Sequence, residues 1–205
     1  MNANKTNIVV SIEKIIENVM NDVKVEINFY KINSLDKYDF WEEHIKYVYN
    51  ESIKLANLYN ADLNVVKLGA LLHDIALIKK IGDRKDHHLN GATLAREILN
   101  KYDIGSDIKE KVIGCVLNHR SSKNATNLEE LCVADADVLA HFDNIPMLFN
   151  SAYNICNVSL NDVKEWMKKC FEDDYNDLSD KTKEIFNQRY KNILDIVLGI
   201  GGEEI

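Results

Sequence analysis

The sequence predicts a single all-α domain, and three observations support this prediction. The chain has 205 residues, 46% of them hydrophobic, which is long enough for one well-filled core. It has only 8 glycines and 1 proline, Pro146, whereas β-sandwiches and barrels need many turns. Apolar residues recur at intervals of three and four along most of the chain, which is the spacing of an amphipathic helix. We therefore expect a compact multi-helix bundle.

The first three helices follow from this spacing. The first covers about residues 8–30 and leads into a looser stretch that ends near residue 38. The second covers residues 39–60. The third covers residues 61–80, with Asp62 as its expected N-cap.

A loop is expected after the third helix, because the segment KKIGDRKD (79–86) combines a glycine with dense charge. The chain is expected to divide into an N-terminal helical extension (1–38), a core (39–145) and C-terminal helices that pack on the same domain (146–205). Further helices are expected near residues 92–99, 108–119, 128–142, 145–157, 160–172 and 179–199.

Charge and cysteine usage exclude several classes of protein. A formal net charge of −8 disfavours general nucleic-acid binding and anionic membranes, since both would repel an acidic chain. The four cysteines form no CxxC pair and are expected to be free thiols in a reducing cytosol. No apolar run approaches the roughly 18 residues of a membrane span, and no signal peptide is recognisable. The expected location is cytoplasmic.

Several histidines and aspartates fall on otherwise apolar helix faces. The octet LLHDIALI (71–78) has His73 and Asp74 at its centre. Asp135 has apolar residues three, four and seven positions away on both sides, and His44 and His119 also lie among apolar residues at helical spacing. Burial of a carboxylate without a partner costs several kcal/mol, so these groups need compensation.

A bound cation provides that compensation, because it offsets carboxylate charge and accepts imidazole lone pairs. The mixed nitrogen and oxygen set favours manganese, iron, cobalt, nickel or zinc over calcium, with magnesium as a further candidate, and it lacks the cysteines of a structural zinc site. The alternative is a helical interaction module whose histidines are hydrogen-bonded in the core. That alternative requires several independent coincidences of residue type and spacing.

These positions resemble the signature of the HD superfamily of metal-dependent phosphohydrolases. The signature is a histidine, a helical His-Asp pair about 30 residues later and a distant aspartate, matched here by His44, His73, Asp74 and Asp135. The segment LGALLHDIALI resembles the central helix of the family, and VADADVLAHFD resembles the helix with a DAD motif in its small bacterial members. The similarity spans residues 40–145 and implies an HD-domain bundle.

The resemblance also implies a second metal position. Many members have a histidine four residues before a Gly-Ala step and another at the end of the next helix, and His87 and His119 match these positions. His88 is the competing choice for His87. One ion or two, bridged by Asp74, would then be held by six residues: His44, His73, Asp74, His87, His119 and Asp135.

The expected activity is hydrolysis of a nucleotide or other small phosphoester by a metal-activated water, with Asp74, His73 and Asp135 as the catalytic residues. The chain departs from the HDIGK form of the family, whose lysine contacts phosphate, because Ala76 and Leu77 stand in its place. Candidate replacements, each with a solvated loop as the alternative role, are Lys79, Lys80, Arg84, Lys85 and Arg120.

Other roles stay open at this stage. Asp137 is interpreted as an exposed helix residue, or else as a partner that orients a ligating histidine. His141, four residues later, is expected to form a surface ion pair with it. The alternative function is a non-catalytic sensor or regulator that binds metal or nucleotide. The first 38 residues are expected either to cap the site or to mediate a homodimer.

Overall fold

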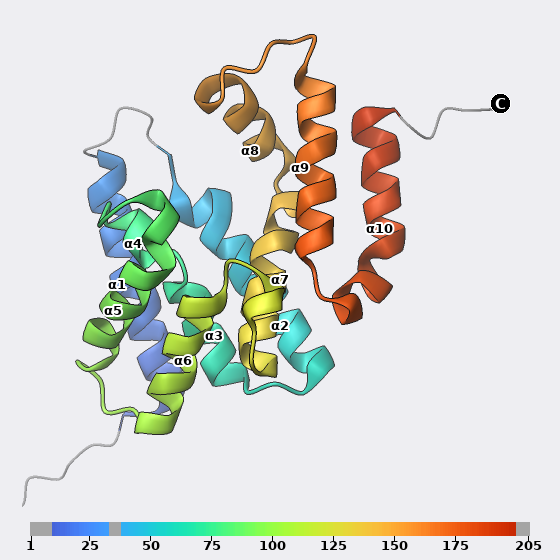
Figure 1. Ribbon diagram of the computed structural model, residues 1–205. Helices are drawn as coiled ribbons and strands as arrows, with labels where there is room; N and C mark the ends of the chain where they lie inside the picture. The colour runs from blue at the N-terminus through green and yellow to red at the C-terminus, as the bar shows by residue number, and fades with distance from the viewer. Residues whose placement is uncertain (1–9, 33–37, 200–205) are drawn as a thin grey trace, which may run out of the picture.

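The computed structural model describes residues 10–32 and 38–199, and within these ranges it is built of helices and contains no strand (Figure 1). This confirms the all-α prediction. No helix in the described ranges is long and apolar enough to cross a membrane.

The helices follow one another with short connections. Two π-helical segments, Trp41–Ile45 and Ser151–Ile155, precede α2 and follow α8, and 3-10 turns lie at Arg84–Asp86 and Ser122–Asn124. The α-helices are α1 (Ile12–Ile32), α2 (Lys46–Tyr59), α3 (Leu63–Leu72), α4 (Ile75–Ile78), α5 (His87–Leu99), α6 (Ser106–Asn118), α7 (Leu128–Asp143), α8 (Ile145–Asn150), α9 (Val163–Asp177) and α10 (Asp180–Leu198).

Helix α7 is the centre of the bundle. It packs against α2, α3 and α6 on one side and against α9 on another, and α9 lies beside α10 (Figure 1). Eleven of its sixteen residues are buried, so polar side chains on different sides of this helix meet different neighbours. One hydrophobic core includes side chains from both ends of the described chain, among them Val19 of α1, Phe171 of α9 and Phe186 of α10. The boundaries at 38 and 145 stay a prediction.

The third helix differs from its expected form. Asp62 is its N-cap, as predicted, because its carboxylate accepts hydrogen bonds from the backbone N–H groups of Asn64 and Val65. The helix does not run continuously to Lys80, however. It ends at Leu72 and restarts as α4, with Asp74 at φ −104°, ψ 18°, outside the regular helical region. This break changes the directions in which His73 and Asp74 project.

Close packing of α3 against α6 and α7 depends on Gly69. A Cβ atom at this position would lie 2.7 Å from Cys115 Cβ and 3.2 Å from Val133 Cγ2. We expect Gly69→Ala to lower the free energy of unfolding by roughly 1–3 kcal/mol, the usual cost of overpacking, as measured by urea denaturation. Gly105→Ala is the control, since no atom lies within 4 Å of its added Cβ. Equal losses in the two variants would contradict the packing argument.

Candidate metal centre

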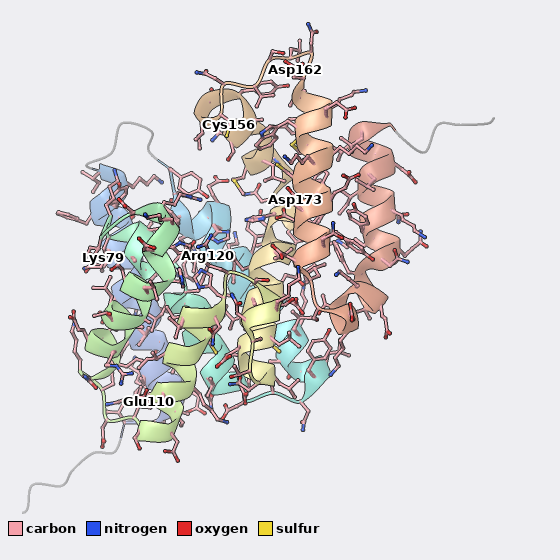
Figure 2. The ribbon with its side chains drawn as sticks, in the orientation of Figure 1. Lys79, Glu110, Arg120, Cys156, Asp162 and Asp173 are labelled. Atoms are coloured by element: carbon pink, nitrogen blue, oxygen red, sulfur yellow. The ribbon has the colours of Figure 1, made fainter. Side chains whose placement is uncertain are left out.

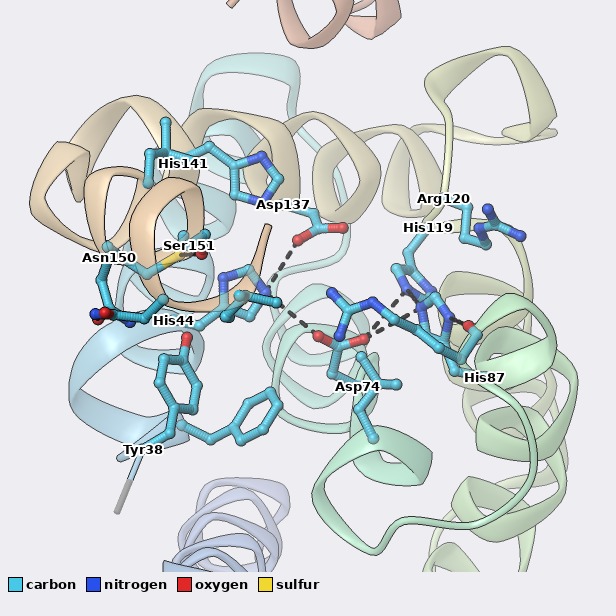
Figure 3. A pocket seen from close by; sticks show the side chains of 17 residues that line it. Tyr38, His44, Asp74, His87, His119, Arg120, Asp137, His141, Asn150 and Ser151 are labelled. Atoms are coloured by element: carbon cyan, nitrogen blue, oxygen red, sulfur yellow. Dashed lines mark hydrogen bonds and ion pairs between the residues drawn. The ribbon is translucent and has the colours of Figure 1, made fainter. Parts of the chain in front are cut away.

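Six polar side chains from five segments of the chain converge beside the centre of α7, and Figure 3 shows five of them, His44, Asp74, His87, His119 and Asp137. Five of them lie at helix ends and breaks, whereas Asp137 lies within a continuous helix. His44 lies in the π-helical segment before α2, a type of local widening that is frequent at functional sites. The others are His73 and Asp74 at the break between α3 and α4, His87 at the start of α5, His119 directly after α6, and Asp137 in α7.

The first half of the cluster is built around His44. Its Nε2 atom lies 3.1 Å from His73 Nε2, 3.1 Å from Asp137 Oδ1 and 3.4 Å from Asp74 Oδ2. His73 Nε2 lies 3.5 Å from Asp74 Oδ2 and 3.7 Å from Asp137 Oδ1. Two imidazole nitrogens and two carboxylates thus face one small volume. This half offers ligand atoms of the types that divalent transition metals bind.

The second half uses the other oxygen of the same aspartate. Asp74 Oδ1 lies 3.3 Å from His87 Nε2 and 3.6 Å from His119 Nε2, and these two nitrogens lie 2.9 Å apart. Asp74 therefore presents one oxygen to each half of the cluster (Figure 3). Ligand atoms of His44, His73 and Asp74, and separately those of Asp74, His87 and His119, all lie within 4.8 Å of one another.

The hydrogen bonds of the Nδ1 atoms determine which nitrogen carries the proton in three of the imidazole rings. The Nδ1 atoms of His73, His87 and His119 lie 2.8, 2.7 and 2.7 Å from the backbone carbonyl oxygens of Ala70, Arg84 and Val116. A carbonyl oxygen only accepts, so each Nδ1 donates, and each neutral ring has its lone pair on Nε2. Metal-binding histidines typically use their second nitrogen in this way.

In these tautomers the Nε2 atoms of His87 and His119 repel each other, and a bound cation would remove the repulsion. Their Nε2 atoms are 2.9 Å apart, and in the neutral rings both would present lone pairs to each other. Two acceptors at this distance repel unless a proton or a metal ion lies between or beside them. The residues present therefore fit a bound transition metal, and the buried His and Asp groups are consistent with a metal site.

Charge coupling within the cluster supports the same interpretation. Burial alone would lower the pKa of His44, but its hydrogen bonds to Asp137 and Asp74 outweigh burial and raise this pKa to about 10. Burial alone would raise the pKa of Asp74, yet attraction to His73 and hydrogen bonds from His119 and His44 hold it well below its usual value. Both shifts favour a positive charge beside the two carboxylates, which is the charge that a bound cation would also supply.

The structure corrects the prediction for Asp135, which lies outside this cluster. Its carboxylate accepts hydrogen bonds from the backbone N–H of Ser179 at 2.9 Å, the hydroxyl of Ser179 at 2.5 Å and the hydroxyl of Thr182 at 2.6 Å. Burial raises the pKa of Asp135, although these hydrogen bonds oppose the rise. Apolar neighbours predicted burial correctly, but a helix buried on several sides has more than one interior face. Asp135 faces the start of α10.

Asp137 occupies the position that was assigned to Asp135. It is two residues further along α7, about 200° around the helix, and its side chain is only 20% exposed. Attraction to His44 and His73 overcomes the effect of burial and lowers its pKa below the usual value. The signal in the sequence was the pair of small residues Ala134 and Ala140, three positions before and after it, which leaves room for side chains from other helices.

Two further histidines differ in their surroundings. The ring of His141 stacks on His44 with centroids 5.9 Å apart, and its Nδ1 atom lies 3.0 Å from Asp174 Oδ2 of α9. His141 thus pairs with Asp174, and one of its ring nitrogens also forms, with ligand atoms of His44 and Asp137, a third group whose members lie within 4.8 Å of one another. His88 contributes no ligand atom to the groups above, and its buried Nδ1 has no partner among the described residues. The geometry favours His87 over His88.

The cluster opens into a cavity of about 940 Å³ (Figure 3). Much of its lining consists of residues that the sequence did not single out, from the stretch just before α2, from α8 and from the π-helical segment after α8. These wall residues are Tyr38, Phe40, Met147, Leu148, Asn150, Ser151, Asn154 and Ile155.

The predicted phosphate-binding cations separate into two groups. Arg84 and Arg120 line the cavity, and Arg120 Nη1 also donates a hydrogen bond of 2.8 Å to the Lys85 carbonyl. Lys79 pairs instead with Glu26 of α1, and Figure 2 shows it toward the outer edge of the view, with Arg120 nearer the centre. Lys80 lies over the ring of Tyr30, 4.0 Å from its centroid, and does not line this cavity.

Comparison with known proteins gives a family match over the same residues. A family model described as HD domain matches residues 41–141, which include all six residues of the cluster. A curated tRNA (cytidine(56)-2'-O)-methyltransferase from Picrophilus torridus is 29% identical over 162 residues, which cover 69% of this chain and 45% of that protein. The chain thus spans less than half the length of this curated relative.

Two crystal structures match nearly the whole chain. The Lin1889 protein from Listeria innocua has a TM-score of 0.63 at 20% identity, covering 93% of this chain and 96% of that one. An HD-superfamily hydrolase from Bacillus thuringiensis has a TM-score of 0.64 at 16% identity, covering 91% and 95%. At these identities the likeness establishes the fold alone.

Proposed function

The chain belongs to the HD domain superfamily, and from this membership we propose that it is a metal-dependent phosphohydrolase acting on a small phosphorylated substrate, with a nucleotide as the first candidate. The observation that carries the proposal is the pair of ligand groups joined by Asp74. Three of the four histidines in these groups use Nδ1 to bond backbone carbonyls, which leaves Nε2 available for a metal.

The proposed ligands divide between two positions. One ion would be held by His44, His73, Asp74 and Asp137, and a second by Asp74, His87 and His119. This mixed nitrogen and oxygen set suits manganese, iron, cobalt, nickel or zinc, whereas magnesium prefers oxygen ligands. When bound, a divalent ion makes hydroxide available near neutral pH and offsets negative charge on phosphate oxygens.

The protein residues supply position and charge for this chemistry. Asp74 and Asp137 are acceptors on one side of the cavity, and Arg84 and Arg120 place positive charge on its wall, where phosphate oxygens would lie. Apolar residues such as Leu77 and Met147 line the same cavity. A volume of about 940 Å³ exceeds what a phosphate group fills and leaves room for a nucleoside-sized group.

The test combines metal analysis with turnover. Purified protein should contain a transition metal, and it should hydrolyse members of a panel of nucleoside mono-, di- and triphosphates and simple phosphate mono- and diesters. We expect removal of the metal by chelation to lower the rate at least about 100-fold, and added manganese to restore it.

The adjacent histidines give a matched pair of variants for this test. His87→Ala is expected to lower metal content and activity, whereas His88→Ala should leave both close to wild type, because only His87 contributes a ligand atom. Metal binding without turnover of any substrate would support a sensor role instead. Absence of metal after reconstitution would overturn the proposal.

A further inference from the structure

A second, smaller cavity lies beside the metal centre, and we propose that it binds a second phosphate group of the substrate. This inference rests on the proposed function, because it extends the same site. The cavity has a volume of about 380 Å³. It shares four wall residues with the larger cavity: Tyr38, Phe40, Leu77 and Arg84. A ligand with one phosphate at the metal centre could therefore extend a second one past Arg84 into this space.

The charges around the smaller cavity favour an anion. Two cationic residues, Lys80 and Arg84, line it, and no carboxylate is among the described residues of its wall. The larger cavity, in contrast, has Asp74 and Asp137 in its wall. In a chain with a net charge of −8, a cavity with only basic charged residues stands out as a site for a negatively charged group.

The backbone at Lys80 has an unusual conformation. Helix α4 ends with hydrogen bonds from Ile81 N to Ala76 O at 2.9 Å and from Lys80 N to Leu77 O at 3.2 Å, which together form a Schellman motif. In this motif the position of Lys80 has a positive φ, here 49°, and glycine is strongly preferred. A lysine at this position is conformationally costly, but it places an ammonium group at the cavity.

Tyr30 supplies a second, independent observation. Its hydroxyl oxygen is buried and has no hydrogen-bond partner among the described residues, although buried polar groups are nearly always paired. Tyr30 lines the smaller cavity, and its ring lies under the ammonium group of Lys80, 4.0 Å from the ring centroid. A phosphate oxygen in the cavity would accept a hydrogen bond from this hydroxyl and an ionic contact from Lys80.

The neighbouring lysine provides the matched control. Lys79 lies in the same turn and has the same charge, but it pairs with Glu26 of α1 and lines neither cavity. Removal of the charge at Lys79 therefore changes the net charge equally without changing the proposed subsite.

The first experiment measures binding without catalysis. Inorganic phosphate and pyrophosphate are titrated calorimetrically into chelator-treated protein, and we expect wild type to bind pyrophosphate at least about 10-fold more tightly than phosphate. Lys80→Gln and Tyr30→Phe should remove most of this preference, whereas Lys79→Gln should retain it. Equal affinity for the two anions in wild type, or equal effects of Lys79→Gln and Lys80→Gln, would overturn the proposal.

A glycine variant separates binding from folding. Lys80→Gly should raise the melting temperature, because glycine suits the left-handed position, and should at the same time weaken pyrophosphate binding. A purely structural lysine would not lower anion affinity while the protein became more stable. Unchanged pyrophosphate binding in the more stable Lys80→Gly protein would reject the subsite.

Turnover distinguishes failure of the subsite from failure of the proposed function. Suppose that wild type hydrolyses phosphoesters and that Lys80→Gln has the same ratio of rates as wild type on substrates with one and two phosphate groups. The proposed function is then supported and the subsite is rejected. If no substrate is hydrolysed but the preference for pyrophosphate over phosphate depends on Lys80, the subsite is supported and the proposed function is rejected.

Discussion

Asp74→Asn is expected to reduce hydrolysis by at least about 1,000-fold and to lower the bound metal to one equivalent or less. Asp74 is the residue that the two halves of the cluster share, with Oδ2 3.4 Å from His44 Nε2 and Oδ1 3.3 Å from His87 Nε2. Asparagine has one carbonyl oxygen and one amide group without a negative charge. One half of the cluster would therefore face a hydrogen-bond donor where it now faces a carboxylate.

This prediction is checked by metal analysis and steady-state kinetics on the same preparation. Asp83→Asn is a suitable control, since Asp83 is exposed in the loop before α5 and belongs to none of the ligand groups. Circular dichroism establishes that the Asp74→Asn protein is folded. Full metal content together with wild-type turnover in the folded variant would show that Asp74 is not a bridging ligand.

Asp135→Asn is expected to lower stability, whereas Asp137→Asn is expected to lower metal content and activity, although the two residues are only two positions apart. Asp135 accepts three hydrogen bonds from Ser179 and Thr182, and an asparagine amide cannot accept all three. We expect Asp135→Asn to lower the free energy of unfolding by about 3 kcal/mol. The corresponding fall in melting temperature is about 10 °C for a chain of this size.

Asp137→Asn should instead lose metal and activity while it stays folded, because Asp137 faces the histidines and forms no hydrogen bond or ion pair with α10 among the described residues. Thermal melts and metal analysis on both variants make the comparison. Ser179→Ala should reproduce the melting behaviour of Asp135→Asn with a smaller loss, since it removes the hydroxyl that donates to that carboxylate and caps α10, while the backbone N–H of residue 179 still donates. A stable but inactive Asp135→Asn protein would show that Asp135, and not Asp137, belongs to the metal centre.

The sequence was sufficient for the fold class and for most residues of the cluster. Helical periodicity predicted the α-helices, and the inward positions of His44, His73, Asp74 and His119 follow from spacing alone. His87, by contrast, lies on a partly exposed helix start, and only the resemblance to the HD superfamily pointed to it. The roles of these five residues as metal ligands stay a prediction.

The error at Asp135 has a physical origin. Helical spacing shows whether a side chain points to the apolar side of its helix, but α7 is covered by other helices on several sides. Periodicity then cannot distinguish a carboxylate that faces histidines from one that faces the hydroxyls of Ser179 and Thr182. That distinction depends on where α10 docks, and this contact joins residues more than 40 positions apart in sequence.

The hydrophobic pattern of the sequence also could not predict the break between α3 and α4. The octet 71–78 is apolar on nearly all positions, so a continuous helix and a helix interrupted at His73 predict the same burial. In a continuous helix, neighbouring side chains diverge by about 100°. The altered backbone at Asp74 allows both residues to face the same cluster.

The walls of the larger cavity come from two different stretches of the chain. All six residues of the cluster lie within 41–141, the range of the HD domain match, whereas Met147, Asn150, Ser151 and Asn154 lie beyond it. The candidate metal centre and much of the cavity wall that would contact a substrate are therefore encoded in different stretches of the chain. A short exchange of residues 147–155 between proteins of this family could redirect substrate choice while the metal ligands remain untouched. One set of metal ligands could in this way be combined with different cavity walls.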